Sequence, residues 1–171
     1  DGDVGAIRYS RLGAPQGETV AAFLRYASGR LRPLGVRVSA AVFGLSATVD
    51  VGVGQEPRLI ARAVDAVSPM VYPSHYTPGS YGLSDPNGAP AETVAGALRD
   101  FRRALRGTDA RLVPWLQAFS LGRPYGLAEV QAQVDAARAA GADGFLLWEH
   151  EGIYGTRVAA LKAGYAGMRG R

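Results

Sequence analysis

Aromatic and polar side chains follow apolar segments at several points of this chain. Short apolar segments are typical of buried strands, and the ends of such strands deliver side chains to a surface. Aromatic rings can stack on the apolar faces of sugar rings, while carboxylate, amide and imidazole groups hydrogen-bond to hydroxyls. The sequence therefore predicts a sugar-binding cleft formed by Arg8, Tyr72, His75, Tyr76, Trp115, Gln117, Trp148 and Glu149.

A structural role is the alternative for several of these side chains. Trp115 and Trp148, the two tryptophans of the chain, could fill the interior of a fold, because aromatic rings are more often core than ligand platforms. His75 could bind a substrate hydroxyl or hold a rigid loop, since Pro69 and Pro73 stiffen this segment. Both interpretations remain open from the sequence.

Among the carboxylates, Glu149 is the strongest catalytic candidate. It directly follows an apolar segment and adjoins Trp148, an environment that suits a carboxyl group to general acid catalysis. Asp85 could reach over the cleft from the long loop in which it lies, but its sequence SDPNG favours a turn, where an aspartate usually acts as a cap. Asp65 precedes a predicted strand at the opposite end of the sheet, and we expect a structural role for it.

Composition excludes several classes of site. With no cysteine and two histidines in 171 residues, disulfides, thiolate sites and a multi-histidine zinc site are not expected, and no cofactor is predicted. The net charge of +4 comes from arginines scattered over predicted helices, without the interleaved aromatic residues of a nucleic-acid surface. No apolar run reaches the ~20 residues that span a membrane.

Periodicity and breakers predict an alternation of strands and helices. We expect strands near 4–9, 36–43, 67–71, 111–119 and 144–148, and helices near 18–32, 56–63, 91–105, 126–140 and 155–168. Residues 77–90 form a long turn-rich loop, which we expect to be functional. The alternation predicts a parallel α/β fold, either an open doubly wound sheet or part of an eight-unit barrel. A nucleotide site is disfavoured, because neither G-x-G-x-x-G nor a P-loop motif occurs.

Several motifs resemble a bacterial family of glycoside hydrolase-like TIM barrels, distantly akin to the α-amylase clan. The matching strings are VSPMVYPSHY at 67–76, PWLQ at 114–117, GFLLW at 144–148, GVRVSAAVFG at 35–44, Gly54-Gln55 and VQAQVDA at 130–136. They keep the family's order almost end to end. The resemblance implies a TIM-barrel-like fold, a polysaccharide or oligosaccharide substrate, and an extracellular or cell-envelope location. Oligomeric state is not readable.

The sequence departs from the family pattern at two carboxylates. Gly5 and Ala41 stand where the family's strand motifs have aspartate, while Arg8 is kept. Glycoside hydrolysis ordinarily uses two carboxylates, so a non-catalytic carbohydrate-binding domain is the alternative to an active enzyme. The motifs also cover only about five of the ~8 β/α units of a closed barrel. We therefore expect residues 1–171 to be a single domain that is incomplete at its N-terminus.

Overall fold

The computed structural model describes residues 13–155. The strand expected near 4–9, with Arg8 and Gly5, lies outside these residues, as does nearly all of the helix expected at 155–168.

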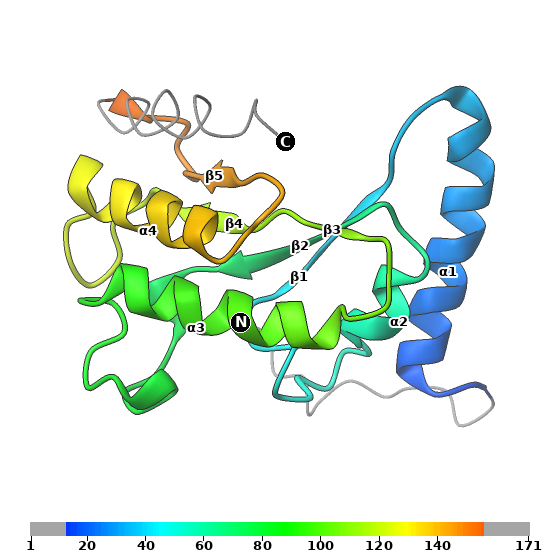
Figure 1. Cartoon of the computed structure of the whole chain (residues 1–171), viewed down its shortest axis with the longest axis horizontal. Helices are drawn as coiled ribbons and strands as arrows, with labels where there is room; N and C mark the ends of the chain where they lie inside the picture. The colour runs from blue at the N-terminus through cyan, green and yellow to red at the C-terminus, as the bar shows by residue number, and fades with distance from the viewer. Residues whose placement is uncertain (1–12, 156–171) are drawn as a thin grey trace.

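The centre of the fold is one sheet in which every strand pair is parallel. Its strands are β1 (Ser39–Phe43), β2 (Ala66–Val71), β3 (Arg111–Leu112), β4 (Trp115–Gln117) and β5 (Leu146–Trp148). The order is β1-β2-β4-β5, and β3 pairs with β2 just before β4 does (Figure 1). The predicted parallel α/β architecture is confirmed.

Helices connect the strands, and proline and glycine help to set their ends. They are α1 (Gln16–Leu31), α2 (Pro57–Ala61), α3 (Pro90–Ala104) and α4 (Leu127–Ala139), with short 3₁₀ turns η2 (Arg32–Leu34), η3 (Pro73–His75) and η4 (Ser80–Gly82). Proline at the first position of α2 and α3 suits a helix start, where its missing N–H needs no partner. After α1 and η2, Gly35 adopts a φ of 77°, which lets the chain turn toward β1.

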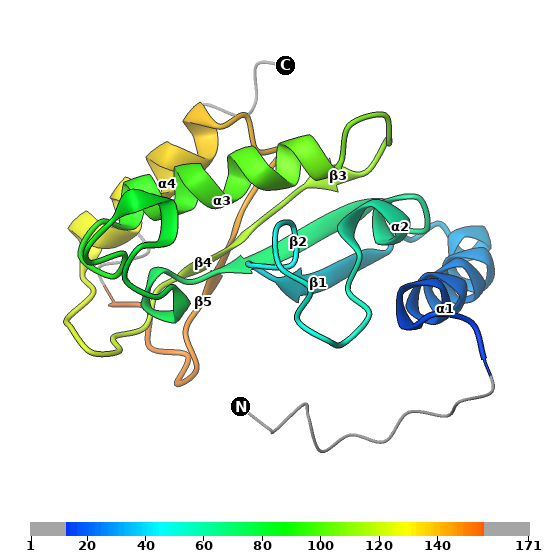
Figure 2. The same cartoon turned by 90° about the horizontal axis from the view of Figure 1, so that it is seen from below.

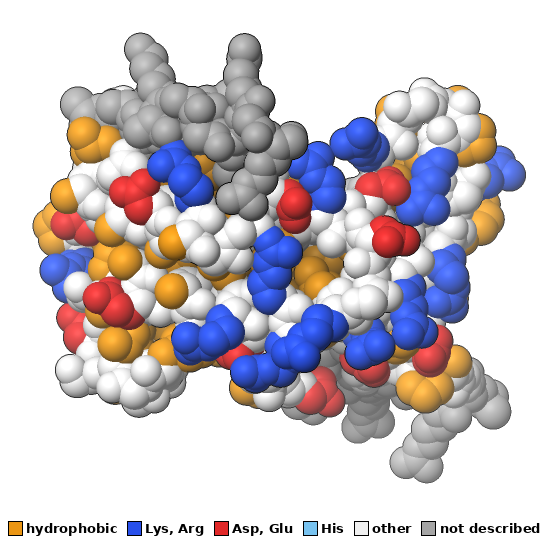
Figure 3. All heavy atoms as spheres, viewed as in Figure 1, with side chains coloured by type: hydrophobic (Ala, Val, Ile, Leu, Met, Phe, Trp, Pro, Cys, Tyr) orange, Lys and Arg blue, Asp and Glu red, His pale blue; other side chains and the backbone are white. Residues whose placement is uncertain are grey.

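One face of the sheet packs against helices and forms the core. Figure 2 shows α3 and α4 lying along this side of the sheet. The buried strand residues of the core include Val42, Val67, Val71, Leu116 and Leu147. They contact apolar residues of α2, α3 and α4, among them Ile60, Val94, Leu98, Phe101 and Val134. Arginine side chains are spread over the outer surface of these helices and are intermixed with acidic ones (Figure 3).

The opposite face carries side chains that no described helix covers. Phe43, Met70, Trp115 and Leu146 form one row across the sheet, because the strand register pairs each with the next. Ala41 and Trp148 lie on the same face, since side chains alternate along a strand. Phe43, Leu146 and Trp148 are 46%, 36% and 44% exposed. These six residues are called the open face below.

The predicted strand at 111–119 is interrupted. It forms β3 and β4 as two pieces, separated by Val113 and Pro114. Proline has no N–H to donate to a neighbouring strand, so the ladder breaks there. The carbonyl of Pro114 still accepts a hydrogen bond from the Leu146 N–H at 2.8 Å, which keeps β5 in register.

Within residues 13–155, none of the helices has the length and apolar content that a membrane crossing requires.

Candidate functional site

The two tryptophans lie together on the open face. Trp115 of β4 and Trp148 of β5 have ring centroids 5.9 Å apart and ring planes at 87°, an edge-to-face contact. Trp148 is 44% exposed and Trp115 is partly buried. The predicted proximity of these side chains is therefore present in the fold. Neither ring packs into the helix-covered core.

Gln117 does not reach the surface. Its side chain is fully buried, and its Oε1 accepts hydrogen bonds from the Ser74 N–H at 3.1 Å and the Ser74 hydroxyl at 2.9 Å. Its Nε2 donates to the Phe119 carbonyl at 3.1 Å. The direct ligand contact predicted for Gln117 is thus replaced by a positioning role. The amide fixes the η3 turn, which folds over the end of β4.

Sequence reasoning missed the residue that holds Gln117. Gln133, on α4, accepts a hydrogen bond from the Gln117 N–H at 2.9 Å and donates to the Gln117 carbonyl at 2.8 Å. Its side chain thereby serves as a strand partner for the backbone of β4. The sequence offered one sign of this role, namely that Gln133 lies on the apolar side of the helix predicted at 126–140. A buried glutamine must find partners for both its oxygen and its nitrogen.

An aromatic cluster stands beside the open face at the strand ends. Tyr72 contacts His75 and Phe119 edge to face, with each pair of centroids 5.4 Å apart. Phe119 also contacts His75 at 6.1 Å and His150 at 6.0 Å. Both histidines of the chain therefore flank one phenylalanine. Phe119 and His150 lie next to predicted site residues, but only the tertiary fold brings them together.

Burial sets the protonation of two side chains in this cluster. It lowers the pKa of His75, because desolvation disfavours the imidazolium, so the ring is neutral at neutral pH. Its Nδ1 lies 3.1 Å from the Ser74 hydroxyl. Burial also raises the pKa of Tyr72 to about 12, which keeps the phenol protonated. Desolvation of His75 is only partial, because the residue is still exposed to solvent. Tyr72, in contrast, has an exposed fraction of 9%.

Tyr76 belongs to the core rather than to a ligand site. It is 6% exposed and packs against Tyr81, with centroids 5.8 Å apart. Burial is the main cause that raises the pKa of its hydroxyl. A Cβ at Gly44 would approach both the Tyr76 hydroxyl and the Met70 carbonyl to 2.5 Å, so this contact requires glycine. The prediction that Tyr76 lines a cleft is corrected by its burial.

Glu149 follows β5, and its carboxylate organises the next turn. Its Oε2 accepts hydrogen bonds from the N–H groups of Glu151 at 2.9 Å and Ile153 at 2.8 Å. Its Oε1 lies 3.7 Å from Nδ1 of His150, and 5% of the side chain is exposed. The structure thus gives Glu149 a role in holding residues 149–153. Its role as a general acid stays a prediction.

Asp65 and Asp85, the other two carboxylates considered in the sequence analysis, have the structural contacts that were expected. Asp65 accepts a hydrogen bond from the Val38 N–H at 2.7 Å and pairs with Arg32 at 3.0 Å. Asp85 accepts a bond from the Gly88 N–H at 2.9 Å and pairs with Arg123 at 3.3 Å. Asp85 therefore caps a turn within the 77–90 loop and also ties this loop to Arg123, which lies 38 residues further along the chain.

Three positions correspond to catalytic motifs of the family that the sequence resembles, and only Ala41 lies within the described residues. Arg8 and Gly5 precede the described residues. Ala41 is exposed on β1 and pairs with Ser68 of β2. The position of the family's aspartate in this strand therefore lies on the open face. Within residues 13–155, no three His, Asp or Glu side chains gather as a metal site requires.

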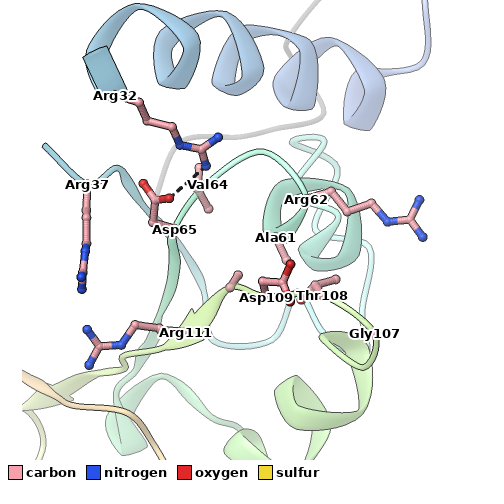
Figure 4. A pocket seen from close by; sticks show the side chains of 11 residues that line it. Arg32, Arg37, Ala61, Arg62, Val64, Asp65, Gly107, Thr108, Asp109 and Arg111 are labelled. Carbon is pink, nitrogen blue, oxygen red and sulfur yellow. Dashed lines mark hydrogen bonds and ion pairs between the residues drawn. The ribbon is translucent and has the colours of Figure 1, made fainter. Parts of the chain in front are cut away.

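Much of the predicted site at the strand ends is exposed to solvent. Its exposed members are Phe43, His75, Trp148 and His150, whereas Trp115, which contacts Trp148, is partly buried. A cavity of about 620 Å³ lies instead at the amino ends of the strands, between the segments before β2 and β3 (Figure 4). The predicted ligand-binding residues lie at the opposite, carboxyl ends of the strands, which is where ligands of parallel α/β folds bind.

Comparison with known proteins gives both a family and a fold. A family model described as "Putative glycosyl hydrolase domain" matches residues 1–154. Among solved structures, the glycoside hydrolase domain of PgaB (BpsB) from Bordetella bronchiseptica is similar, with 17% identity and a TM-score of 0.53. The alignment covers 85% of this chain and 43% of that one. No curated protein matches the sequence.

A second solved structure is more distant. Bee venom hyaluronidase aligns with 20% identity and a TM-score of 0.47, over 86% of this chain and 49% of that one. The chain thus spans less than half the length of either structure. The similarity to the PgaB domain shows that residues 13–155 have the fold of part of a TIM barrel, with the helices outside and the open face inside.

Proposed function

Because this chain belongs to the "Putative glycosyl hydrolase domain" family, we propose that its open face binds sugar rings for glycosidic bond hydrolysis. The observation that carries this proposal is the Trp115–Trp148 pair, with ring centroids 5.9 Å apart and Trp148 44% exposed. Two perpendicular rings can contact a sugar from below and from the side. Their apolar surface is available without any rearrangement of the core.

Hydrogen-bonding groups lie next to these rings. Gln117 pairs with Trp148 in the strand register and orients Ser74, which adjoins His75. A neutral, exposed imidazole can donate to one hydroxyl and accept from another. His75 is therefore the proposed polar contact, with Tyr72 and Phe119 holding its ring. Gln117 and Gln133 act through this turn as positioning residues.

Glu149 is the proposed general acid. Both backbone bonds go to its Oε2, so Oε1, which lies 3.7 Å from Nδ1 of His150, is the oxygen proposed to face a glycosidic bond beside Trp148. Hydrolysis ordinarily requires a second carboxylate, acting as nucleophile or base. The carboxylate that the resemblance expects on β1 is replaced by Ala41. The partner acid would therefore come from outside residues 13–155.

The proposed active unit is a complete barrel. The open face exposes Phe43, Leu146 and Trp148, and a contiguous apolar surface of this kind usually marks an interface. In a TIM barrel the inward-facing side chains of all strands pack together. We therefore propose that further β/α units of the same protein cover part of this face. They would leave the carboxyl ends of the strands as the ligand site.

A second candidate function is carbohydrate binding without hydrolysis. Ala41 favours it, because a barrel that lacks this acid retains the aromatic surface but has one fewer catalytic group. The two backbone bonds to Glu149 favour it as well, since they give the carboxylate a structural use.

Glu149→Gln separates the two candidates. Glutamine retains an oxygen that can accept both backbone bonds, so the turn is expected to persist while the acid is lost. Wild type and variant, each produced as the protein with its complete barrel, would be tested for binding to a polysaccharide array and for release of reducing sugar from every polysaccharide bound. Hydrolysis that disappears in the variant while binding persists supports the enzyme. Binding without hydrolysis in the wild type supports the second candidate.

Two further results bear on the residues. Hydrolysis that is unchanged in Glu149→Gln would remove Glu149 from the mechanism. Trp148→Ala should weaken binding, and Phe23→Ala is the control, because it removes a 66% exposed ring of α1 that does not belong to the open face. If both variants bound the polysaccharide with equal affinity, the sugar would not bind at Trp148.

A further inference from the structure

A second candidate site lies at the opposite end of the sheet from the tryptophans. The cavity of about 620 Å³ is bounded by the segments that enter β1, β2 and β3. Four arginines line it, Arg32, Arg37, Arg62 and Arg111, together with the two acids Asp65 and Asp109 (Figure 4). The lining therefore carries two more positive than negative charges.

The negative charge of Asp65 is already used. It accepts the Val38 N–H at 2.7 Å and pairs with Arg32 at 3.0 Å. The bond from Val38, followed by Arg32, lowers the pKa of Asp65, so this acid stays ionised and neutralises Arg32. Arg32 and Asp65 form a closed pair at one side of the cavity. Arg37 lies close enough to lower the pKa of Asp65 as well, but it makes a weaker contribution than Arg32.

Among the described residues, none of the other three arginines forms an ion pair with a carboxylate, although the charge of Asp65 acts on Arg37 from a distance. Arg111 donates to the Asp143 backbone carbonyl at 2.9 Å, which is a neutral acceptor. Within residues 13–155, no hydrogen bond or ion pair is formed by Arg37 or Arg62. In Figure 4, the side chains of Arg37 and Arg111 extend to the same side of the cavity, whereas Arg62 points away. Two guanidinium groups on the same side repel each other unless an anion lies between them.

We propose that Arg37 and Arg111 bind an oxyanion in this cavity, such as a phosphate group or the carboxylate of an acidic sugar. Guanidinium groups present paired N–H donors that match two oxygens of such a group. Arg37 precedes β1 and Arg111 begins β3, so two separate segments of the sheet would hold the ligand. This proposal is independent of the proposed function at the other end of the sheet.

The test is a calorimetric titration of the chain with inorganic phosphate and, separately, with glucuronate at low ionic strength. The double variant Arg37→Gln/Arg111→Gln should bind the preferred ligand roughly tenfold more weakly or worse, because it loses the charge-assisted bonds. The matched control Arg30→Gln/Arg99→Gln removes the same charge from exposed positions that do not line the cavity. Thermal unfolding of both variants checks that the fold is retained.

The outcomes are distinct. Binding that is lost in the first variant and kept in the control supports the site. Preference for phosphate assigns a phosphoryl ligand, and preference for glucuronate assigns an acidic sugar. Equal weakening in both variants, or no binding by the wild type at millimolar ligand, overturns the proposal, because net charge alone would then account for the arginines.

Discussion

The two faces of the sheet are built from the same strands but are covered differently. Val42, Val67 and Leu116 on one face are at most 1% exposed, because α3 and α4 pack on them. On the other face, Phe43 and Trp148 are 46% and 44% exposed. Alternation along each strand separates residues that specify the fold from residues free to bind a ligand or the rest of a barrel.

The predicted site residues divide along the same line. Trp115, Trp148 and His75 can contact a ligand directly. Tyr76 and Gln117 are buried, and Glu149 is nearly so. Residue types at strand ends thus predicted side chains that lie near one end of the sheet, whereas the accessibility of each side chain depended on neighbouring segments.

The largest contrast between the faces should appear in stability. Phe101→Ala removes a fully buried ring from the helix-covered core and should lower the free energy of unfolding by about 3–5 kcal/mol. Trp148→Ala on the open face should cost no more than about 1 kcal/mol, since its ring has less contact to lose. Urea unfolding of the 171-residue chain measures both values. Similar losses would mean that the open face is covered in solution.

The buried glutamine pair should show an effect of the same order as the core ring. Gln133→Leu leaves the N–H and carbonyl of Gln117 without their side-chain partner, at a cost of about 1–3 kcal/mol for each group left unpaired. Gln131→Leu is the control on the same helix, where one bond to Asp135 is lost and a change within about 0.5 kcal/mol is expected.

A readout at the site distinguishes positioning from stability alone. In Gln133→Leu, the NMR signals of the His75 ring should shift, because Gln117 no longer holds Ser74 in the same place. Unchanged His75 signals would contradict the proposed path from α4 to the η3 turn.

Sugar binding should respond to the open face alone. Trp148→Ala should weaken binding of the preferred polysaccharide about 3- to 10-fold, the equivalent of about 0.5–1.5 kcal/mol for an aromatic contact. Phe101→Ala, assayed under conditions where it is still folded, should bind with unchanged affinity. Affinity electrophoresis compares both variants with the wild type. If Phe101→Ala weakened sugar binding more than Trp148→Ala did, the proposed location of the sugar on the open face would be wrong.

The smallest effect concerns the amino end of the sheet and depends on pH. The pKa of Asp65 is lowered in the folded chain by the Val38 N–H and Arg32, so its ionised form adds stability above the ordinary Asp range. This contribution is lost as pH falls through the lowered pKa. The difference in unfolding free energy between wild type and Asp65→Asn should therefore shrink below about pH 4. A difference that stays constant from pH 7 to pH 3 would exclude this role.

Local sequence signals predicted most of the elements but not their interruptions. Apolar spacing placed α1, α3 and α4 within two residues of their observed bounds. Pro114 split one predicted strand, because strand propensity does not count the N–H that proline lacks. The 77–90 loop was expected to be functional. That expectation stays a prediction, and the structure adds that hydrogen bonds tie Asn87 to the Leu121 carbonyl and Tyr125 to the Asn87 carbonyl, contacts across 34 and 38 residues that local sequence does not encode.

The sequence by itself determined the parallel α/β alternation, the strand ends that carry aromatic and polar groups, and the family motifs. These features follow from residue type and from spacing over a few positions. Only the tertiary structure decided which of those groups reach the surface. Ser74 covers Gln117 across 43 residues, Tyr81 encloses Tyr76, and Trp115 meets Trp148. Burial is a property of packing between distant segments, and for that reason it could not be predicted from any one of them.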